Sequence, residues 1–155
     1  MEEKLVSLLQ EKKMTITTVE SCTGGLVASK IVNVSGASEV FHEGFITYAN
    51  SAKETYAGVL KETLDKYGAV SSQVAMEMAE GAAKKTGADV AVSVTGIAGP
   101  NGGTKEKPVG LVYIGCFAGG QTYYKEYPFE GERLEIREKS ASEAINFAIA
   151  LIEML

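Results

Sequence analysis

Two candidate nucleophiles stand side by side near the start of the chain. Ser21 and Cys22 follow a stretch rich in β-branched residues, Thr15–Glu20, and precede the run Thr23-Gly24-Gly25. A hydroxyl or thiol at a strand-to-helix turn can be exposed, with backbone N–H groups ahead of it to form an oxyanion hole. A helix N-terminus would favour Cys22 by lowering its thiol pKa. The alternatives are that Ser21 is a helix N-cap and Cys22 a small buried apolar residue.

A serine nucleophile needs a base, and the chain has a single histidine, His42. His42 lies inside a predicted strand, where a structural or edge role is expected. Lysine can act as the base where burial or a nearby positive charge lowers its pKa. Lys53 lies in the first turn of a predicted helix, at the positive end of the helix dipole, and Tyr48 shortly precedes it. Lys53 and Tyr48 are therefore candidate partners of the nucleophile, although a solvated lysine and a packing tyrosine remain the alternative.

A second glycine-rich segment, Thr95–Gly103, follows the apolar stretch Val90–Val94 and holds four glycines and a proline in nine positions. Ligands of α/β proteins bind outside the carboxyl ends of strands. Glycine lets backbone N–H groups approach such a ligand closely, so we expect this loop to bind one. The segment has neither the G-x-G-x-x-G spacing nor a following Gly-Lys-Ser/Thr, so neither a dinucleotide cofactor nor ATP is indicated.

Composition narrows the function further. The 155 residues suit one domain, 1–155, and carry 15 basic and 20 acidic side chains, for a net charge of −5 without a basic run. Nucleic-acid binding is therefore not expected. Two cysteines and one histidine indicate no disulfide framework, no metal site and no cofactor. The chain shows no signal peptide and no membrane-spanning apolar run, so we expect a cytoplasmic domain with no membrane partner.

Strands and helices alternate along the chain. Helices are predicted over the first dozen residues, 26–32, 50–55, 61–67, from Ser71 or Ser72 to 86, and 132–154, and strands over 15–20, 40–48, 90–94, 109–118 and 121–129. Gly119-Gly120 joins the last two strands as a hairpin. This alternation predicts an α/β fold, a single-domain three-layer α/β/α sandwich with a mixed β-sheet.

Several strings, in order along essentially the whole chain, resemble the CinA C-terminal domain, a family named for competence/damage-inducible protein. They are Glu20–Gly25, Ile46–Lys53, Gly68–Ser71, Thr95–Gly103 and Lys107–Gly110, with Phe129–Arg133 and Arg137. The resemblance implies an amidohydrolase of the PncC type, which converts nicotinamide mononucleotide and water to nicotinic acid mononucleotide and ammonia. The expected ligand is a pyridine nucleotide, and the family suggests a homodimer.

By the same resemblance, Ser21 attacks the carboxamide, Lys53 accepts its proton, and Tyr48 relays the proton or orients the pair. Backbone amides near Thr23 and Gly24 would hold the oxyanion, and the Thr95–Gly103 loop the ribose phosphate. Either Arg133 or Arg137 would be the charge partner of the phosphate. The expected substrate-binding residues are Thr23, Gly24, Gly25, Thr95, Gly96, Gly99, Gly102, Gly103, Arg133 and Arg137.

The chain departs from the family pattern in two respects. Glu132 stands where many relatives carry aspartate. Many relatives also carry an N-terminal molybdopterin-binding-like domain, whereas this chain starts at Met1 with a predicted helix; we expect a stand-alone form without the ADP-ribose pyrophosphatase activity of that domain. The alternative function is a non-catalytic nucleotide-binding or interaction module tied to competence or DNA damage. The complete Ser21, Tyr48 and Lys53 set favours the enzyme.

Overall fold

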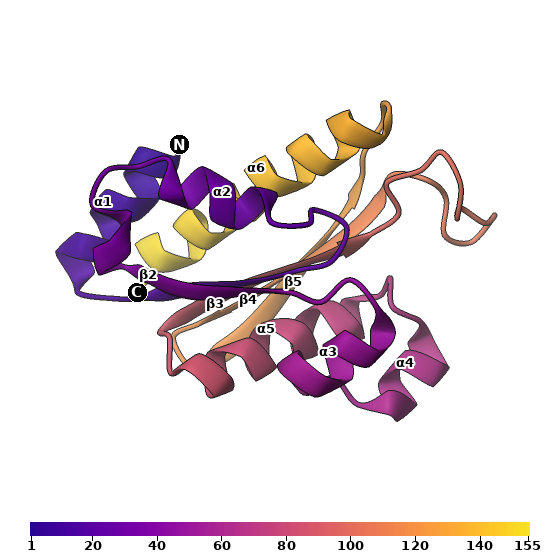
Figure 1. Ribbon diagram of the computed structural model, residues 1–155, viewed down its shortest axis with the longest axis horizontal. Coiled ribbons are helices and arrows are strands. Elements are labelled where there is room, and N and C mark those ends of the chain that lie inside the picture. Colours follow the sequence, from indigo (N-terminus) through magenta and orange to yellow (C-terminus); the bar gives the residue numbers. More distant parts are fainter.

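A five-stranded mixed sheet with helices on both faces forms the body of the protein (Figure 1). A computed structural model describes residues 1–155. The strands are β1 (Ile16–Glu20), β2 (Phe41–Ile46), β3 (Val90–Gly96), β4 (Leu111–Ala118) and β5 (Gln121–Pro128). The helices are α1 (Glu2–Lys12), α2 (Leu26–Val32), α3 (Asn50–Ala57), α4 (Lys61–Tyr67), α5 (Ser72–Thr86) and α6 (Arg133–Glu153), with a 3₁₀ turn at Ala37–Glu39.

The strand order is β2-β1-β3-β4-β5. β1 pairs in parallel with β2 and β3, whereas β3–β4 and β4–β5 are antiparallel. The parallel pairs are joined by helices, as crossover connections require, and the antiparallel β4–β5 pair by a tight turn. The predicted mixed sheet is confirmed. The carboxyl ends of β1, β2 and β3 consequently lie at one edge of the sheet.

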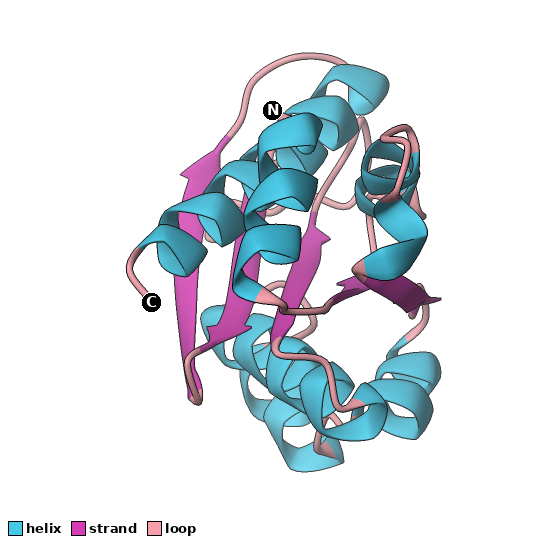
Figure 2. Cartoon of the chain, turned by 90° about the vertical axis from the view of Figure 1, so that its left-hand side faces the viewer, coloured by secondary structure: helices cyan, strands magenta, loops and turns pink.

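Two helical layers enclose the sheet. Helices α1, α2 and α6 cover one face and α3, α4 and α5 the other, and Figure 2, which looks from the end where both termini lie, shows the strands between them. The larger apolar cluster lies under α1, α2 and α6 and includes Ile16, Val92 and Ile145. The smaller cluster, which includes Val19 and Met78, lies under α5. The predicted three-layer α/β/α sandwich is confirmed.

Local turn chemistry accounts for several boundaries. Gly119 and Gly120 have φ values of 62° and 79°, which matches the two positive φ angles of a type I′ hairpin turn. Ser71, rather than Ser72, caps α5, since its Oγ accepts a hydrogen bond from the amide of Val74 at 3.2 Å. The pairing of β1 with β2 shifts register next to Gly44, which is the bulge that a glycine inside a strand favours.

The boundaries that differ from prediction gather near the carboxyl edge of the sheet. β2 ends at Ile46 instead of Tyr48, because the carbonyls of Thr47 and Tyr48 are taken by the side chain of Lys53. Asn50 begins α3 and is not its cap. β3 continues to Gly96, and β4 begins at 111 instead of 109. The irregular segments between these elements therefore line the edge at which the candidate nucleophile lies.

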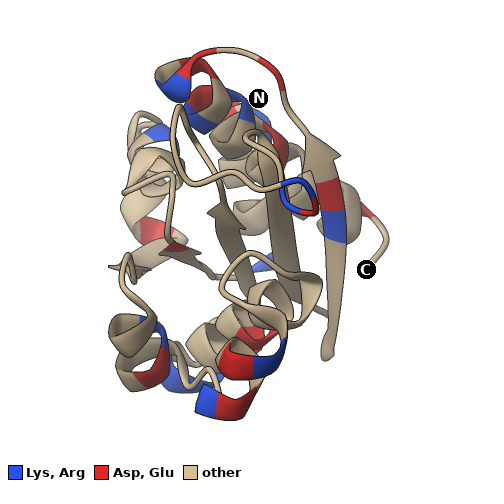
Figure 3. Cartoon of the chain, turned by 90° about the vertical axis from the view of Figure 1, so that its right-hand side faces the viewer, with Lys and Arg blue, Asp and Glu red and all other residues tan.

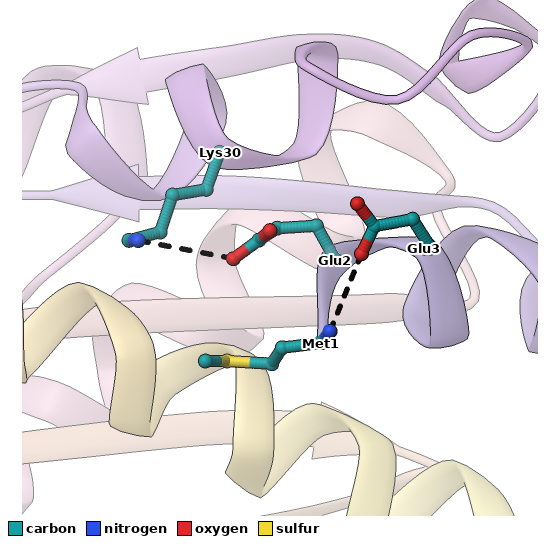
Figure 4. A network of polar contacts seen from close by, with 4 residues as sticks. All are labelled: Met1, Glu2, Glu3 and Lys30. Carbon is teal, nitrogen blue, oxygen red and sulfur yellow. Dashed lines mark hydrogen bonds and ion pairs between the residues drawn. The ribbon is translucent and has the colours of Figure 1, made fainter.

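Surface ion pairs add little to this framework. Figure 4 shows Lys30 of α2 reaching Glu2 of α1, with 3.8 Å between Lys30 Nζ and the Glu2 carboxylate, and the Met1 amino group 3.3 Å from Glu3. Lys30 and Glu2 are partly buried, whereas the Met1–Glu3 pair is more exposed. Ion pairs at a protein surface contribute roughly 0–1 kcal/mol. The layers are held mainly by the two apolar clusters. No helix has both the length and the apolar character that crossing a bilayer requires.

Candidate active site

Ser21 lies at the carboxyl end of β1 and is fixed there by its backbone, because its amide donates to the carbonyl of Val94 on β3 at 2.9 Å. Its hydroxyl Oγ lies 3.0 Å from Lys53 Nζ and 3.5 Å from the carbonyl oxygen of Tyr48. The structure thus brings together the three residues that the sequence singled out for catalysis.

Lys53 is buried, with 1% of its surface exposed. Its Nζ contacts the carbonyl oxygens of Thr47 at 3.0 Å and Tyr48 at 3.1 Å in addition to the Ser21 hydroxyl. No carboxylate forms an ion pair with it. Burial lowers the pKa of the Lys53 amine, and the neighbouring Cys22 opposes that effect only in part. Burial, more than the helix terminus invoked from the sequence, is therefore what depresses the pKa.

The three oxygens around Lys53 Nζ can be satisfied in both protonation states of the amine. An ammonium group donates to the Ser21 hydroxyl and to both carbonyls, whereas neutral lysine, with two N–H donors and one lone pair, donates to the carbonyls and accepts from the hydroxyl. Burial of an ammonium group without an anion is costly, which favours the neutral form. In that form Lys53 has the lone pair that a general base needs, within hydrogen-bond distance of the Ser21 hydroxyl.

Cys22 is a poor nucleophile in this structure. It is buried, and burial raises the pKa of its thiol to about 11, which leaves it protonated at neutral pH. The argument that a helix N-terminus would lower this pKa fails because the N-terminus of α2 is already occupied by Glu20.

Glu20 is the site residue that sequence reasoning missed. Only 1% of its surface is exposed, and its carboxylate accepts hydrogen bonds from the amides of Gly25 at 3.2 Å, Val27 at 2.9 Å and Ala28 at 3.1 Å. A carboxylate at a helix N-terminus satisfies unpaired amides and complements the helix dipole. The amide of Gly25, an expected substrate-binding residue, is therefore already engaged within the chain. The available signal was an acidic residue just before a glycine-containing turn into a helix.

The turn after β1 has two unused amides. Gly24 was expected to help bind an oxyanion, and its amide donates to the carbonyl of Ser21 at 3.1 Å. The amides of Cys22 and Thr23 have no acceptor within the chain. The Thr23 side chain is buried with its Oγ1 unpartnered. Of these two amides only that of Cys22 belongs to a residue on the cavity wall, since Thr23 is completely buried.

Arg137 of α6 lies behind this turn. Its Nε donates to the carbonyl of Cys22 at 2.9 Å, and its Nη2 to the carbonyl of Thr23 at 3.0 Å. The guanidinium therefore binds the backbone of the nucleophile turn, and Arg137 is not among the residues that line the adjacent cavity.

Arg133 joins Tyr48 to the glycine-rich loop. Its Nη1 donates to the carbonyl of Gly99 at 2.7 Å, and its Nη2 to the hydroxyl of Tyr48 at 3.2 Å. Tyr48 is 62% exposed, and its contact with Lys53 runs through its backbone carbonyl. The phenol hydroxyl of Tyr48 thus accepts a hydrogen bond from Arg133, and its backbone carbonyl accepts one from Lys53.

The Thr95–Gly103 segment begins as strand and continues as loop. Thr95 is buried, and its Oγ1 donates to the carbonyl of Ala69 at 2.8 Å. A Cβ at Gly96 would collide with Val112, and one at Gly99 or Gly103 with Val109, so close packing requires these glycines. The loop also carries a series of amides without acceptors in the chain. They belong to Ala98, Gly99, Asn101, Gly102 and Gly103.

A cavity of about 280 Å³ opens beside Ser21. It is lined by Ser21, Cys22, Tyr48, Asn50, Lys53, Ala69, Val70, Thr95, Gly96, Ile97, Ala98, Gly99, Asn101, Gly102 and Arg133. No carboxylate lines it, and Arg133 supplies its fixed positive charge. Figure 3 looks at this end of the sheet, with charged residues coloured on the outer helices, on the long loop and on one outer strand. A cavity with a positive charge and no carboxylate favours an anionic ligand.

The lining includes only part of the expected substrate-binding set. Thr95, Gly96, Gly99, Gly102 and Arg133 line the cavity, whereas Thr23, Gly24, Gly25, Gly103 and Arg137 do not. Asn50 and Asn101, which were not expected to bind substrate, contribute amide side chains to the wall. A larger hollow of about 600 Å³ between α3 and α5 contains no serine, cysteine or histidine.

The remaining polar residues offer no competing centre. His42 is exposed on the edge strand β2, as the sequence indicated. No three His, Cys, Asp or Glu side chains come together in a way that could hold a metal ion.

The fold and site define a three-layer α/β protein with a buried serine–lysine pair at the carboxyl edge of its sheet. The family model of the CinA C-terminal domain matches residues 1–152, and the chain belongs to that family. It is 56% identical over 147 residues to a "CinA-like protein" of Kosmotoga olearia, an alignment covering 95% of this chain and 36% of that protein. The chain thus spans about a third of the length of the curated relatives it matches.

Solved structures of the family share the whole fold. The competence/damage inducible protein CihA from Agrobacterium tumefaciens is 42% identical, with a TM-score of 0.93, over 97% of this chain and 94% of that chain. A CinA superfamily protein from Klebsiella pneumoniae is 27% identical, with a TM-score of 0.95, over 99% of this chain and 96% of that chain.

Proposed function

We propose that this protein is a nicotinamide mononucleotide deamidase, which hydrolyses the carboxamide to nicotinic acid mononucleotide and ammonia. The observation that carries the proposal is the Lys53 amine, buried without a counter-ion and 3.0 Å from the Ser21 hydroxyl. A binding module needs no uncompensated buried lysine in contact with a serine. Burial of such a lysine lowers the stability of the fold, and a role as general base explains why the residue is nevertheless present.

In the first half-reaction Ser21 Oγ bonds to the carboxamide carbon while its proton passes to neutral Lys53. The carbonyl electron pair moves onto oxygen, and the amide of Cys22, which lines the cavity, is the uncommitted donor for that oxyanion. One such donor contributes about 3–4 kcal/mol to the transition state. The intermediate then collapses, the C–N bond breaks, and the nitrogen takes the proton from Lys53 and leaves as ammonia.

In the second half-reaction water attacks the acyl-enzyme carbon and gives a proton to Lys53. The bond to Ser21 Oγ breaks, and Oγ recovers that proton as the acid is released. Lys53 is neutral at the start and at the end of each half-reaction, so it serves first as base and then as acid.

The surroundings of the pair support a phosphate-bearing substrate. Four residues of this loop with unpaired amides line the cavity together with Arg133; they are Ala98, Gly99, Asn101 and Gly102. Successive free N–H groups and arginine both suit phosphate oxygens. Of the two arginines expected from the sequence, Arg133 is the one we assign to the phosphate.

The decisive experiment incubates the purified protein with nicotinamide mononucleotide and measures ammonia together with nicotinic acid mononucleotide. We expect equal amounts of both products from the wild type and neither from Ser21→Ala. Binding of the nucleotide by both proteins, without turnover by either, would instead identify a non-catalytic nucleotide-binding module.

A further inference from the structure

The loop between β3 and β4 carries most of the unpaired amides of the candidate site. Figure 1 shows it projecting beyond the sheet at the end where α4 lies. Its first residues, up to Gly102, supply a large part of the cavity wall. Residues 103–108 form no helix or strand, and all of them except Lys107 are exposed. Because exposed loops are mobile unless other contacts tie them down, the positions of the amides depend on what holds this loop.

Lys107 makes the only hydrogen bond that joins residues 100–107 to the rest of the chain. Its Nζ donates to the carbonyl oxygen of Tyr67, the last residue of α4. The other two hydrogen bonds stay within the loop, since the Thr104 amide donates to the Lys107 carbonyl at 2.7 Å and the Lys107 amide to Thr104 Oγ1 at 3.0 Å. A positive charge at a helix C-terminus also complements the carbonyls and the dipole there.

The end of α4 is a firm attachment point for the loop. Glu77 of α5 binds the start of α4, because its carboxylate accepts from the amide of Leu60 at 2.9 Å and from the hydroxyl of Thr63 at 2.7 Å. A Cβ at Gly68 would lie 2.9 Å from Lys107 Nζ, so the absence of a side chain there leaves room for the amine. Lys107 therefore ties an exposed loop to a helix that is already held by α5.

The two segments joined in this way both line the cavity. Residues 69–70 follow α4, and the loop contributes four of the five residues 98–102. In the interior, the buried Thr95 Oγ1 donates to the carbonyl of Ala69 at 2.8 Å. At the surface, Lys107 makes the second connection between the same two parts of the wall. Loss of the surface connection would leave the outer part of the loop without a hydrogen bond to the α4 side.

We propose that Lys107 is a positioning residue that holds the phosphate-binding loop against α4 and thereby determines the preference for a phosphorylated substrate. The inference deepens the proposed amidohydrolase function and rests on it, since the loop amides are the groups assigned to the phosphate. Lys107 is not among the residues that line the cavity, so it acts on the phosphate through the loop backbone. A loop held in its binding conformation pays less ordering entropy when the ligand binds.

The first test compares wild type with Lys107→Met and with Lys105→Met. The latter is the matched control, because it removes an exposed positive charge from the same loop that forms no ion pair. We expect KM for nicotinamide mononucleotide to rise about tenfold in Lys107→Met, as for the loss of one hydrogen bond made by a charged group, with kcat unchanged. We expect wild-type KM in Lys105→Met. For nicotinamide riboside, which lacks the phosphate, kcat/KM is expected to be the same in all three proteins.

The second test does not depend on turnover. Ribose 5-phosphate presents the same phosphate on a ribose, and calorimetry measures its Kd. We expect this Kd to be about tenfold higher for Lys107→Met than for wild type and Lys105→Met. This result in a protein that releases no ammonia from nicotinamide mononucleotide would refute the deamidase and leave the role of Lys107 standing.

A third measurement separates positioning of the loop from direct binding of the phosphate. In the ligand-free protein, NMR order parameters report amide motion on the ps–ns timescale and relaxation dispersion reports it on the μs–ms timescale. We expect the amides of residues 101–107 to be more mobile in Lys107→Met than in wild type, and those of α4 to be unchanged. A lysine that only binds the phosphate would leave the ligand-free loop as it is in the wild type.

Four results would overturn the inference. The first is a Lys107→Met protein with wild-type KM and Kd, or a wild type that neither binds ribose 5-phosphate nor turns over the nucleotide. The second is an equal loss in Lys105→Met, which would make the effect one of charge alone. The third is an equal loss of kcat/KM with nicotinamide riboside, which would mean general damage to the site. The fourth is unchanged loop mobility with a raised KM, which would make Lys107 a direct phosphate ligand.

Discussion

The carboxylate of Glu20, the last residue of β1, lies 2.9 Å from the amide nitrogen of Val27 in the first turn of α2. The same carboxylate also accepts from the amides of Gly25 and Ala28. Strand and helix are thereby joined around the turn that contains Ser21. The nucleophile is held in place from within its own strand–turn–helix unit.

Removal of this carboxylate is expected to destabilise the protein. Glu20→Ala leaves the buried amide of Val27 and the part-buried amides of Gly25 and Ala28 without an acceptor. We expect a loss of about 3 kcal/mol in the free energy of unfolding by urea denaturation. Glu20→Gln keeps one acceptor oxygen and is expected to lose less. Glu11→Ala, at an exposed glutamate with no partner, is the control. Equal stability of Glu20→Ala and Glu11→Ala would show that the cap contributes nothing.

Substitution of Ser21 and substitution of the adjacent Cys22 are expected to have different effects on ammonia release. Because burial raises the pKa of Cys22 to about 11, Cys22→Ala is expected to keep a substantial part of the ammonia release, and Ser21→Ala to have none. Iodoacetamide at pH 8 is expected to leave Cys22 unmodified, as mass spectrometry can show. An active Ser21→Ala together with an inactive Cys22→Ala would identify a cysteine hydrolase.

Lys53 is expected to act through its neutral form. Arginine keeps its charge at any working pH, so Lys53→Arg is expected to be as inactive as Lys53→Met although it preserves the positive charge. Since burial lowers the pKa of Lys53, kcat of the wild type is expected to rise with pH through a midpoint below the ordinary lysine value of about 10.4. Near-wild-type turnover by Lys53→Arg would show that a fixed charge is enough.

The buried amine also predicts a pH-dependent stability. The folded-state pKa of Lys53 lies below its unfolded value, so between these two values the unfolded chain binds more protons and stability rises with pH. The free energy of unfolding of wild type relative to Lys53→Met is expected to be lowest below the folded-state pKa and to increase up to about pH 10.4.

Lys61→Met is the matched control for this measurement. Lys61 is exposed, and its ion pair with Asp65 raises its pKa. Any change with pH in the stability of wild type relative to Lys61→Met therefore has the opposite sign to that for Lys53→Met. Urea denaturation at a series of pH values gives both slopes. A difference between wild type and Lys53→Met that does not change with pH would mean that Lys53 titrates normally.

The two functional groups of Tyr48 can be separated by one substitution. Tyr48→Phe removes the hydroxyl that accepts from Arg133 and keeps the carbonyl that accepts from Lys53. Loss of one such hydrogen bond corresponds to a decrease of about tenfold in kcat, much less than that of Ser21→Ala. If Tyr48→Phe were as inactive as Ser21→Ala, the hydroxyl would have to take part in proton transfer.

Local patterns in the sequence were enough to predict the elements and the fold class. Apolar periodicity together with capping residues and glycines located all six helices, and the paired glycines at 119 and 120 identified the hairpin because their φ angles need no tertiary support. The positions of Ser21, Tyr48 and Lys53 near predicted element ends marked them as candidates. The predicted end of β2 at Tyr48 was less accurate, because the Tyr48 carbonyl accepts a hydrogen bond from the Lys53 side chain of the following helix.

Tertiary structure decided what these candidates can do. Ser21 and Lys53 are 32 positions apart, and only the folded arrangement, in which α3 packs against α5, brings their atoms to 3.0 Å and buries the amine. Glu20 and Arg137 acquire their partners in the same way, the latter across more than a hundred residues. Periodicity and spacing report on neighbours along the chain. A pKa and a hydrogen-bond partner depend on neighbours in space, and those exist only once the layers have assembled.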